Sequence, residues 1–241
     1  MRRLHGAIAA PAIVAATALS YLAAFAIGVP LLVPFLNVAA GFPFMVAALK
    51  RGQTGEAIWR MLIWAAALGV CATLISYVAT ADAARLFLRG ESYRAEMFDF
   101  IRTGQGREGD IRAFLPQHAL HAAAFSLLAI ATGAVLAMPL GAFLMNYMAY
   151  YVGALAATSA HPSKAIALAW VPWAIVRVMS FVTLGVVLAG PVLSRVAGFP
   201  YRLAQQRRWI ALAVSGLLLD VIMKWALAPW WRHLLRAAAG W

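Results

Sequence analysis

Long apolar runs constrain this chain more than any other feature of its sequence. Several runs of about twenty residues carry almost no charge, and about twenty residues is the length that an α-helix needs to cross roughly 30 Å of hydrocarbon. A transmembrane β-barrel would instead show short segments of alternating hydrophobicity. The sequence therefore predicts an all-α, polytopic helical membrane protein.

The composition agrees with this class. Hydrophobic residues make up 64% of the 241 positions and charged residues only 12%, whereas a soluble domain has about 25% charged residues. The net charge is +12, but the basic residues form no concentrated stripe. We therefore expect them to contact anionic lipid headgroups beside the spans and not nucleic acid.

Six to seven spans are expected within a single membrane domain, residues 1–241. The second is interrupted by Pro34, Gly41 and Pro43, so it either crosses as a kinked helix or forms a re-entrant hairpin. Between the fourth and fifth, Met138–Gly141 is the only plausible turn, and one long kinked helix is the alternative. The expected spans are about 7–27, 31–49, 57–79, 119–138, 140–159, 165–190 and 209–230.

One sizeable polar segment, 80–118, separates the third span from the fourth. Its six arginines are balanced by six acidic residues, and 84–102 has the pattern of a short amphipathic helix. The segment is too short for a core of its own. We expect it to cap the bundle or to lie along the outer interface.

Basic residues indicate the orientation. With the N-terminus inside, the inner basic residues are concentrated in shorter segments than the outer ones, and 195–208 alone carries four arginines beside a span. The apolar run that follows Met1-Arg2-Arg3 is too long for a cleaved signal, so we expect a retained first helix. The positive-inside rule then predicts a cytoplasmic N-terminus in the cytoplasmic (inner) membrane of a bacterium.

Three charged residues lie inside predicted spans: Arg177, Asp220 and Lys224. Such a charge costs roughly 2.5 to 3.5 kcal/mol near the centre of a span, so it is retained only where it is paired or used. Asp220 and Lys224 have the spacing of a helical ion pair, and Arg177 meets Asp220 if the last two spans pack antiparallel. One carboxylate then serves two cations, and the second cation favours a substrate, a lipid headgroup or the acid of a partner subunit.

Other motifs point less clearly to chemistry. His118 and His121 share a helix face and are candidate metal ligands, but no HExxH or carboxylate–histidine spacing accompanies them, so interfacial histidines are the simpler interpretation. Residues 103–109 contain a literal G-x-G-x-x-G without a preceding strand, so we interpret it as a flexible turn. No metal, cofactor or catalytic residue is predicted.

Asn146 and Tyr150 follow helical spacing with Gly153 along the fifth span. Small residues permit close helix approach, and an asparagine forms hydrogen bonds across a helix interface. We therefore expect Asn146 and Tyr150 to serve in helix packing, with a ligand contact as the alternative.

Residues 114–188 resemble the stage II sporulation protein M family of membrane proteins. Two features depart from the family pattern, because Tyr147 stands where the family has the glycine of an Asn-Gly pair, and the polar pair lacks its asparagine. The resemblance implies a non-enzymatic membrane component that works inside a larger assembly at the cell envelope. It rests on Phe114, Gln117-His118, Gly133, Asn146, Gly153 and His161-Pro162.

Three functions are compatible with these features. The first is a non-enzymatic accessory or scaffold component of a cell-envelope membrane complex, which docks other membrane subunits through its intramembrane cations. The second is a small permease or transporter with a charged midplane site. The third is a membrane enzyme that acts at the outer face through His118, His121 and nearby carboxylates.

Overall fold

The computed structural model describes residues 2–241, with side chains from Ala9 onward; Arg2 and Arg3, which contribute to the orientation argument, have side chains outside the described part. Within that range the chain forms α-helices and two short 3₁₀ helices, and no strand. The helices are α1 (Arg2–Ile27), α2 (Val33–Lys50), α3 (Thr54–Val78), α4 (Thr80–Leu86), α5 (Gly90–Thr103), α6 (Ile111–Thr132), α7 (Ala137–Ala157), α8 (Pro162–Ala169), α9 (Pro172–Ala197) and α10 (Arg207–Ala239).

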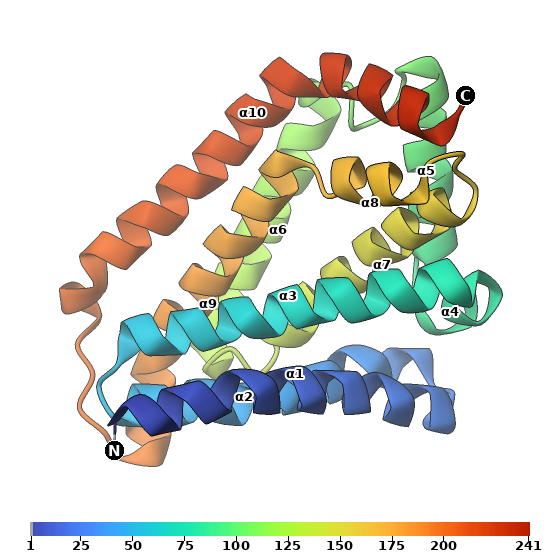
Figure 1. The fold of residues 1–241 in the computed structure, drawn as a ribbon. Coiled ribbons are helices and arrows are strands. Elements are labelled where there is room, and N and C mark those ends of the chain that lie inside the picture. The colour runs from blue at the N-terminus through green and yellow to red at the C-terminus, as the bar shows by residue number, and fades with distance from the viewer. Residues whose placement is uncertain (1) are drawn as a thin grey trace.

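Seven of these helices are long and apolar enough to cross a membrane: α1, α2, α3, α6, α7, α9 and α10. This confirms the predicted fold class, an all-α polytopic membrane protein. The short helices α4, α5 and α8 gather at one end of the bundle with the end of α10 (Figure 1), and we call this end the α5 side. The N-terminus, the α2–α3 turn and the α9–α10 connection lie at the opposite side.

Two predicted boundaries around the fourth span are wrong. The span was expected from 119, but α6 begins at Ile111, because the Asp110 side chain accepts a hydrogen bond from the Arg112 backbone N–H at 2.9 Å and caps the first turn. The following turn is not at Met138–Gly141. Gly133 ends α6 with φ 60°, a conformation that glycine adopts freely, and Pro139 lies in the first turn of α7, where proline is tolerated.

The last two spans also differ from their predicted limits. The span expected at 165–190 is divided, because Val171 is extended before Pro172, which opens α9 and separates it from α8. The last helix continues past 230 to Ala239 and changes direction in its second half (Figure 1), where Pro229 lies inside the helix. The uncertain second span is one continuous helix, α2, with Pro34 in its first turn and Pro43 inside.

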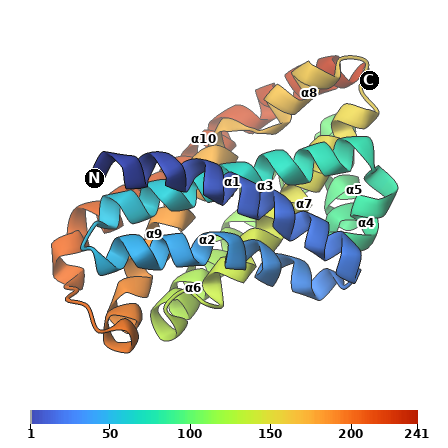
Figure 2. The same cartoon turned by 60° about the horizontal axis from the view of Figure 1, so that its bottom comes forward.

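Close helix approaches hold the bundle together. Figure 2 shows α1, α2 and α3 packed side by side, with α7 behind them. At the crossing of α3 and α7, a Cβ on Gly153 would lie 2.5 Å from the Thr73 carbonyl oxygen. At the crossing of α9 and α10, a Cβ on Gly216 would collide with Ser180. The contact at Gly153 is against backbone and requires glycine, and small residues at such crossings are the usual way that helices pack closely in a bilayer.

Candidate functional site

Asp220 of α10 is the centre of the charged site. Its side chain is fully buried, and Arg177 of α9 donates to it twice, from Nε to Oδ2 at 2.8 Å and from Nη2 to Oδ1 at 2.9 Å. This bidentate geometry is the strongest that an arginine and a carboxylate adopt. The antiparallel packing of α9 and α10 thus brings Arg177 and Asp220 together.

His118 of α6 also contacts this carboxylate. Its Nδ1 lies 3.4 Å from Asp220 Oδ2, and its ring stacks on Phe114 with centroids 5.1 Å apart. His121, one turn further along α6, borders a cavity next to the site. Among the described side chains, from Ala9 onward, no cluster of three or more His, Cys, Asp or Glu residues is placed to hold a metal ion.

Lys224 finds a partner that the sequence did not suggest. Its Nζ lies 2.9 Å from Glu108 Oε1 and 3.4 Å from the centre of the Phe114 ring, and its side chain is only 3% exposed. The angle is poor for a hydrogen bond, so we treat the contact as an ion pair with a cation–π interaction. Both intramembrane cations therefore have an acidic partner within the chain.

Glu108 comes from the loop that joins α5 to α6. Gly104 and Gly106 have φ of 80° and 105°, and these backbone conformations fold the loop back over the bundle. Arg107 fixes the loop to α6 by donating to Gln117 Oε1 at 2.9 Å. The sequence offered one indication of this partner. Two buried cations need more than one carboxylate, and the polar segment 80–118 is the nearest source of a second one.

A cavity of about 110 Å³ lies beside the charged site, enclosed by α3, α5, α6, α7 and α9 and by the Glu108 loop. One end of it is polar and cationic, with Arg89, Arg107 and Arg177. The other end is apolar, with Phe125 and Phe181. Arg107 has a side chain that is 54% exposed, so the polar end reaches the surface at the α5 side.

Arg177 lines this cavity, and one nitrogen of its guanidinium has no hydrogen-bond partner among the described residues. Nε and Nη2 donate to Asp220, but no described residue accepts a hydrogen bond from Nη1, and the side chain is 18% exposed. A guanidinium held on one side by a carboxylate keeps further donors in a fixed plane for an incoming anion. The arrangement is therefore suited to bind a carboxylate, phosphate or similar oxyanion.

The site lies at different distances from the ends of its helices. Because α9 begins at Pro172, Arg177 lies five residues into the helix, or about 7.5 Å from its start. His118 lies seven residues into α6, or about 10 Å. On α3 and α7 the cavity wall includes Ala65 and Tyr147, which lie near the middle of their helices.

A second polar network lies between α1, α2, α3 and α7. Tyr21 donates to Asn146 Oδ1 at 2.6 Å, Asn146 Nδ2 donates to Asn37 Oδ1 at 2.9 Å, and Asn37 Nδ2 donates to Ser20 at 2.9 Å. Trp64 Nε1 donates to the Asn37 carbonyl oxygen at 2.8 Å. Asn146 is thus placed where four helices meet, and every bond in this network is between neutral groups.

Tyr150, the other polar residue predicted to pack, lies elsewhere. Its hydroxyl group donates to Glu91 of α5, and its ring lies against Gly90, where a Cβ would come within 2.9 Å. Tyr150 therefore joins α7 to the polar segment on the α5 side and takes no part in the Asn146 network.

Comparison with known proteins adds nothing to this geometry. No protein-family model matches the chain, and neither a curated protein nor a solved structure matches it. The resemblance of residues 114–188 to the stage II sporulation protein M family stays an expectation from the sequence. What the fold defines is a class: a multi-pass, all-α membrane protein.

Proposed function

We propose that this protein is a small permease that binds an anionic solute in the cavity beside Arg177, in the cytoplasmic membrane of a bacterium with its N-terminus in the cytoplasm. The observation that carries the proposal is that Arg177 lines a cavity that reaches the surface while its Nη1 has no hydrogen-bond acceptor among the described residues. Binding sites at membrane depth are typical of transporters.

The charges around the cavity support an anionic ligand. Arg89, Arg107 and Arg177 border it, against the carboxylates of Glu96 and Glu108. Asp220 lies behind Arg177 and fixes its orientation without lining the cavity. Cationic groups in a cleft with low-dielectric walls attract anions and raise their local concentration.

The experiment is anion binding and flux with the purified protein. We expect inorganic phosphate or succinate to bind to the protein in nanodiscs by isothermal titration calorimetry, and the same anion to enter proteoliposomes. Arg177→Gln removes the guanidinium and should abolish both signals. Arg195→Gln, an exposed arginine near the other end of the same helix, is the matched control and should behave like the wild type.

The opposite result is equally clear. Equal binding and equal flux in the wild type and in Arg177→Gln, with both proteins inserted and folded, would contradict the proposal.

A scaffold within a membrane complex is the second candidate. The sequence suggested this role because one intramembrane cation had no expected acidic partner. That reason is weakened, because Arg177 and Lys224 both pair with acidic side chains of the same chain. The surface that such a role would use is an exposed apolar stripe on α10, formed by Leu218, Ile222 and Trp225 with exposures of 61%, 58% and 67%. Crosslinking of native membranes through this stripe should capture a partner subunit if the scaffold role is correct, and only lipid if it is not.

A further inference from the structure

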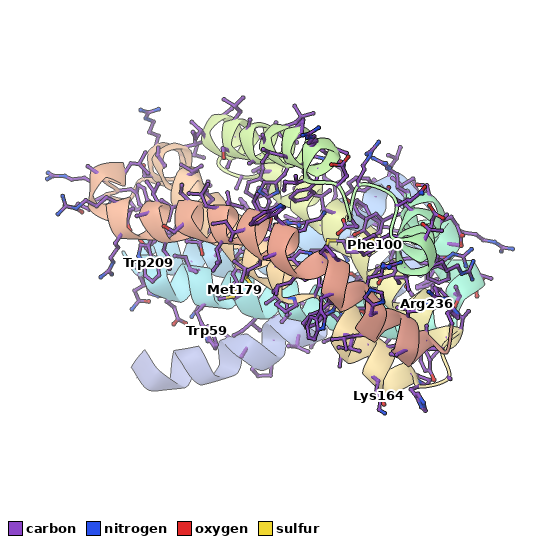
Figure 3. All side chains as sticks on the ribbon, turned by 90° about the horizontal axis from the view of Figure 1, so that it is seen from above. Trp59, Phe100, Lys164, Met179, Trp209 and Arg236 are labelled. Atoms are coloured by element: carbon purple, nitrogen blue, oxygen red, sulfur yellow. The ribbon has the colours of Figure 1, made fainter. Side chains whose placement is uncertain are left out.

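A second hollow lies on the outside of the bundle, next to the charged cavity. It is an apolar groove of about 480 Å³ between α3 and α9, and nearly all of its wall is aliphatic or aromatic. Trp59 on α3 and Met179 on α9, both labelled in Figure 3, form opposite walls with exposures of 60% and 49%.

The groove and the cavity share a wall. Ala65, Met145 and Val178 line both of them, so only these three side chains separate the membrane-facing groove from the charged interior. Ala65 is small, and a methionine side chain is flexible and adapts to irregular neighbours. A small and a flexible side chain thus form part of the wall between the groove and the cavity.

The length of the groove matches a lipid chain. Along α3 it extends from Trp59 to Val70, which are eleven residues or about 16 Å apart. Half of a hydrocarbon core of about 30 Å is about 15 Å, which is the space that one chain of one leaflet occupies. At the α5-side end of the groove, Gly69 has no side chain and so leaves room for the Trp170 ring.

Arg177 lies next to the shared wall in the sequence of α9. It lines the charged cavity, and the following residue, Val178, lines both the cavity and the groove. A ligand head held by Arg177 is therefore one residue away from the groove.

We infer that the anionic ligand is a membrane amphiphile that enters sideways between α3 and α9, with its acyl chain in the groove and its phosphate or carboxylate against Arg177. The inference rests on the proposed function and names the substrate class of the same site. The head and the chain are recognised separately, by the free guanidinium edge and by the aliphatic groove.

The test distinguishes recognition of the ligand's anionic head from recognition of its acyl chain. The protein is reconstituted with phosphatidylcholine and phosphatidylglycerol, then delipidated stepwise and analysed by native mass spectrometry. We expect the wild type to retain phosphatidylglycerol in preference to phosphatidylcholine. Arg177→Gln should lose the preference, and Ala66→Trp, which fills the groove from an exposed position, should reduce retention at least tenfold.

Two controls complete the design. Leu218→Trp places the same side chain on an exposed position of α10 away from the groove and should retain phosphatidylglycerol like the wild type. Met179→Trp fills the groove from its α9 wall, away from the cavity, and repeats the test if Ala66→Trp folds poorly. Inorganic phosphate should still bind to both groove variants, because neither residue lines the cavity and the guanidinium is untouched.

The outcomes distinguish the two proposals. If inorganic phosphate binding depends on Arg177 but lipid retention is the same in every variant, the inference of an amphiphilic ligand is overturned. The proposed binding of a soluble anion is then retained. If phosphatidylcholine is retained equally well, the head is not selected and the inference is again overturned. If neither phosphate nor lipid depends on Arg177, both proposals fail.

Discussion

Two polar networks lie within the bundle, and they are built differently. The network of Tyr21, Asn146, Asn37 and Ser20 joins α1, α2 and α7 through neutral hydrogen bonds, and none of its members has a buried polar atom without a partner. The charged network of Arg177, Asp220, Lys224 and Glu108 joins α9, α10 and a surface loop, and it borders a cavity.

The difference indicates which network holds the fold and which binds a ligand. Polar groups in a membrane interior that satisfy one another fully have no capacity left for a ligand. The charged network retains that capacity, because Arg177 has an unused edge and Lys224 Nζ lacks a well-directed acceptor. Variants in the first network should therefore change stability alone, and variants in the second should change stability and binding.

The largest effect is expected for Asp220→Asn. It leaves Arg177 without its carboxylate in a fully buried position, and breaking one side of a buried ion pair costs roughly 3–5 kcal/mol. Thermal unfolding in detergent measures the loss. The double variant Arg177→Gln/Asp220→Asn should recover most of it, while Asp99→Asn, an exposed acid, should unfold like the wild type.

Glu108→Gln should destabilise the protein less than Asp220→Asn does. It should also strengthen the binding of anions. Losing a hydrogen-bonded or ionic partner of a charged group costs roughly 1.5–3 kcal/mol. The same change removes a carboxylate from the cavity wall, so anions should bind more tightly, with a Kd lower by up to about tenfold, or about 1.4 kcal/mol. Titration calorimetry with inorganic phosphate measures this, and weaker binding would show that Glu108 supports the ligand.

Asn146→Leu tests the neutral network. It keeps the branched shape and the number of heavy atoms but leaves Asn37 Oδ1 without its donor, and a buried polar group without a partner costs roughly 1–3 kcal/mol. The unfolding temperature should fall, whereas the Kd for phosphate should stay the same. A change in the Kd would remove the distinction between the two networks.

The smallest effect is expected for Ser20→Ala. It removes the hydroxyl group that accepts from Asn37 Nδ2 at 2.9 Å and hardly changes the side-chain volume, and a single hydrogen bond contributes roughly 0.5–1.5 kcal/mol. Unfolding of the single variants and of Ser20→Ala/Asn146→Leu forms a double-mutant cycle. Strict additivity would contradict the view that these residues act as one network.

The sequence predicted the membrane class because apolar length alone determines it. It missed helix ends wherever one local contact decides them, as the cap by Asp110 and the extended Val171 before Pro172 do. These contacts involve single residues, and average hydrophobicity over a window does not detect them.

The charged site was predictable only in part. The meeting of Arg177 and Asp220 follows from two consecutive antiparallel helices. The pairing of Lys224 with Glu108 does not, because it depends on positive φ at Gly104 and Gly106 in a loop without periodicity. His118 was assigned to an interface because α6 was expected to begin later than it does.

The bend of α10 at Pro229 has a mechanical consequence. Beyond it, Trp231 anchors the helix by donating to the Leu168 carbonyl oxygen at 2.8 Å, so this end cannot tilt freely. A bilayer that thins or thickens must strain the helix at the bend, five residues from Lys224. We therefore expect the spacing of Lys224 and Glu108 to change with the lipid chain length of the bilayer.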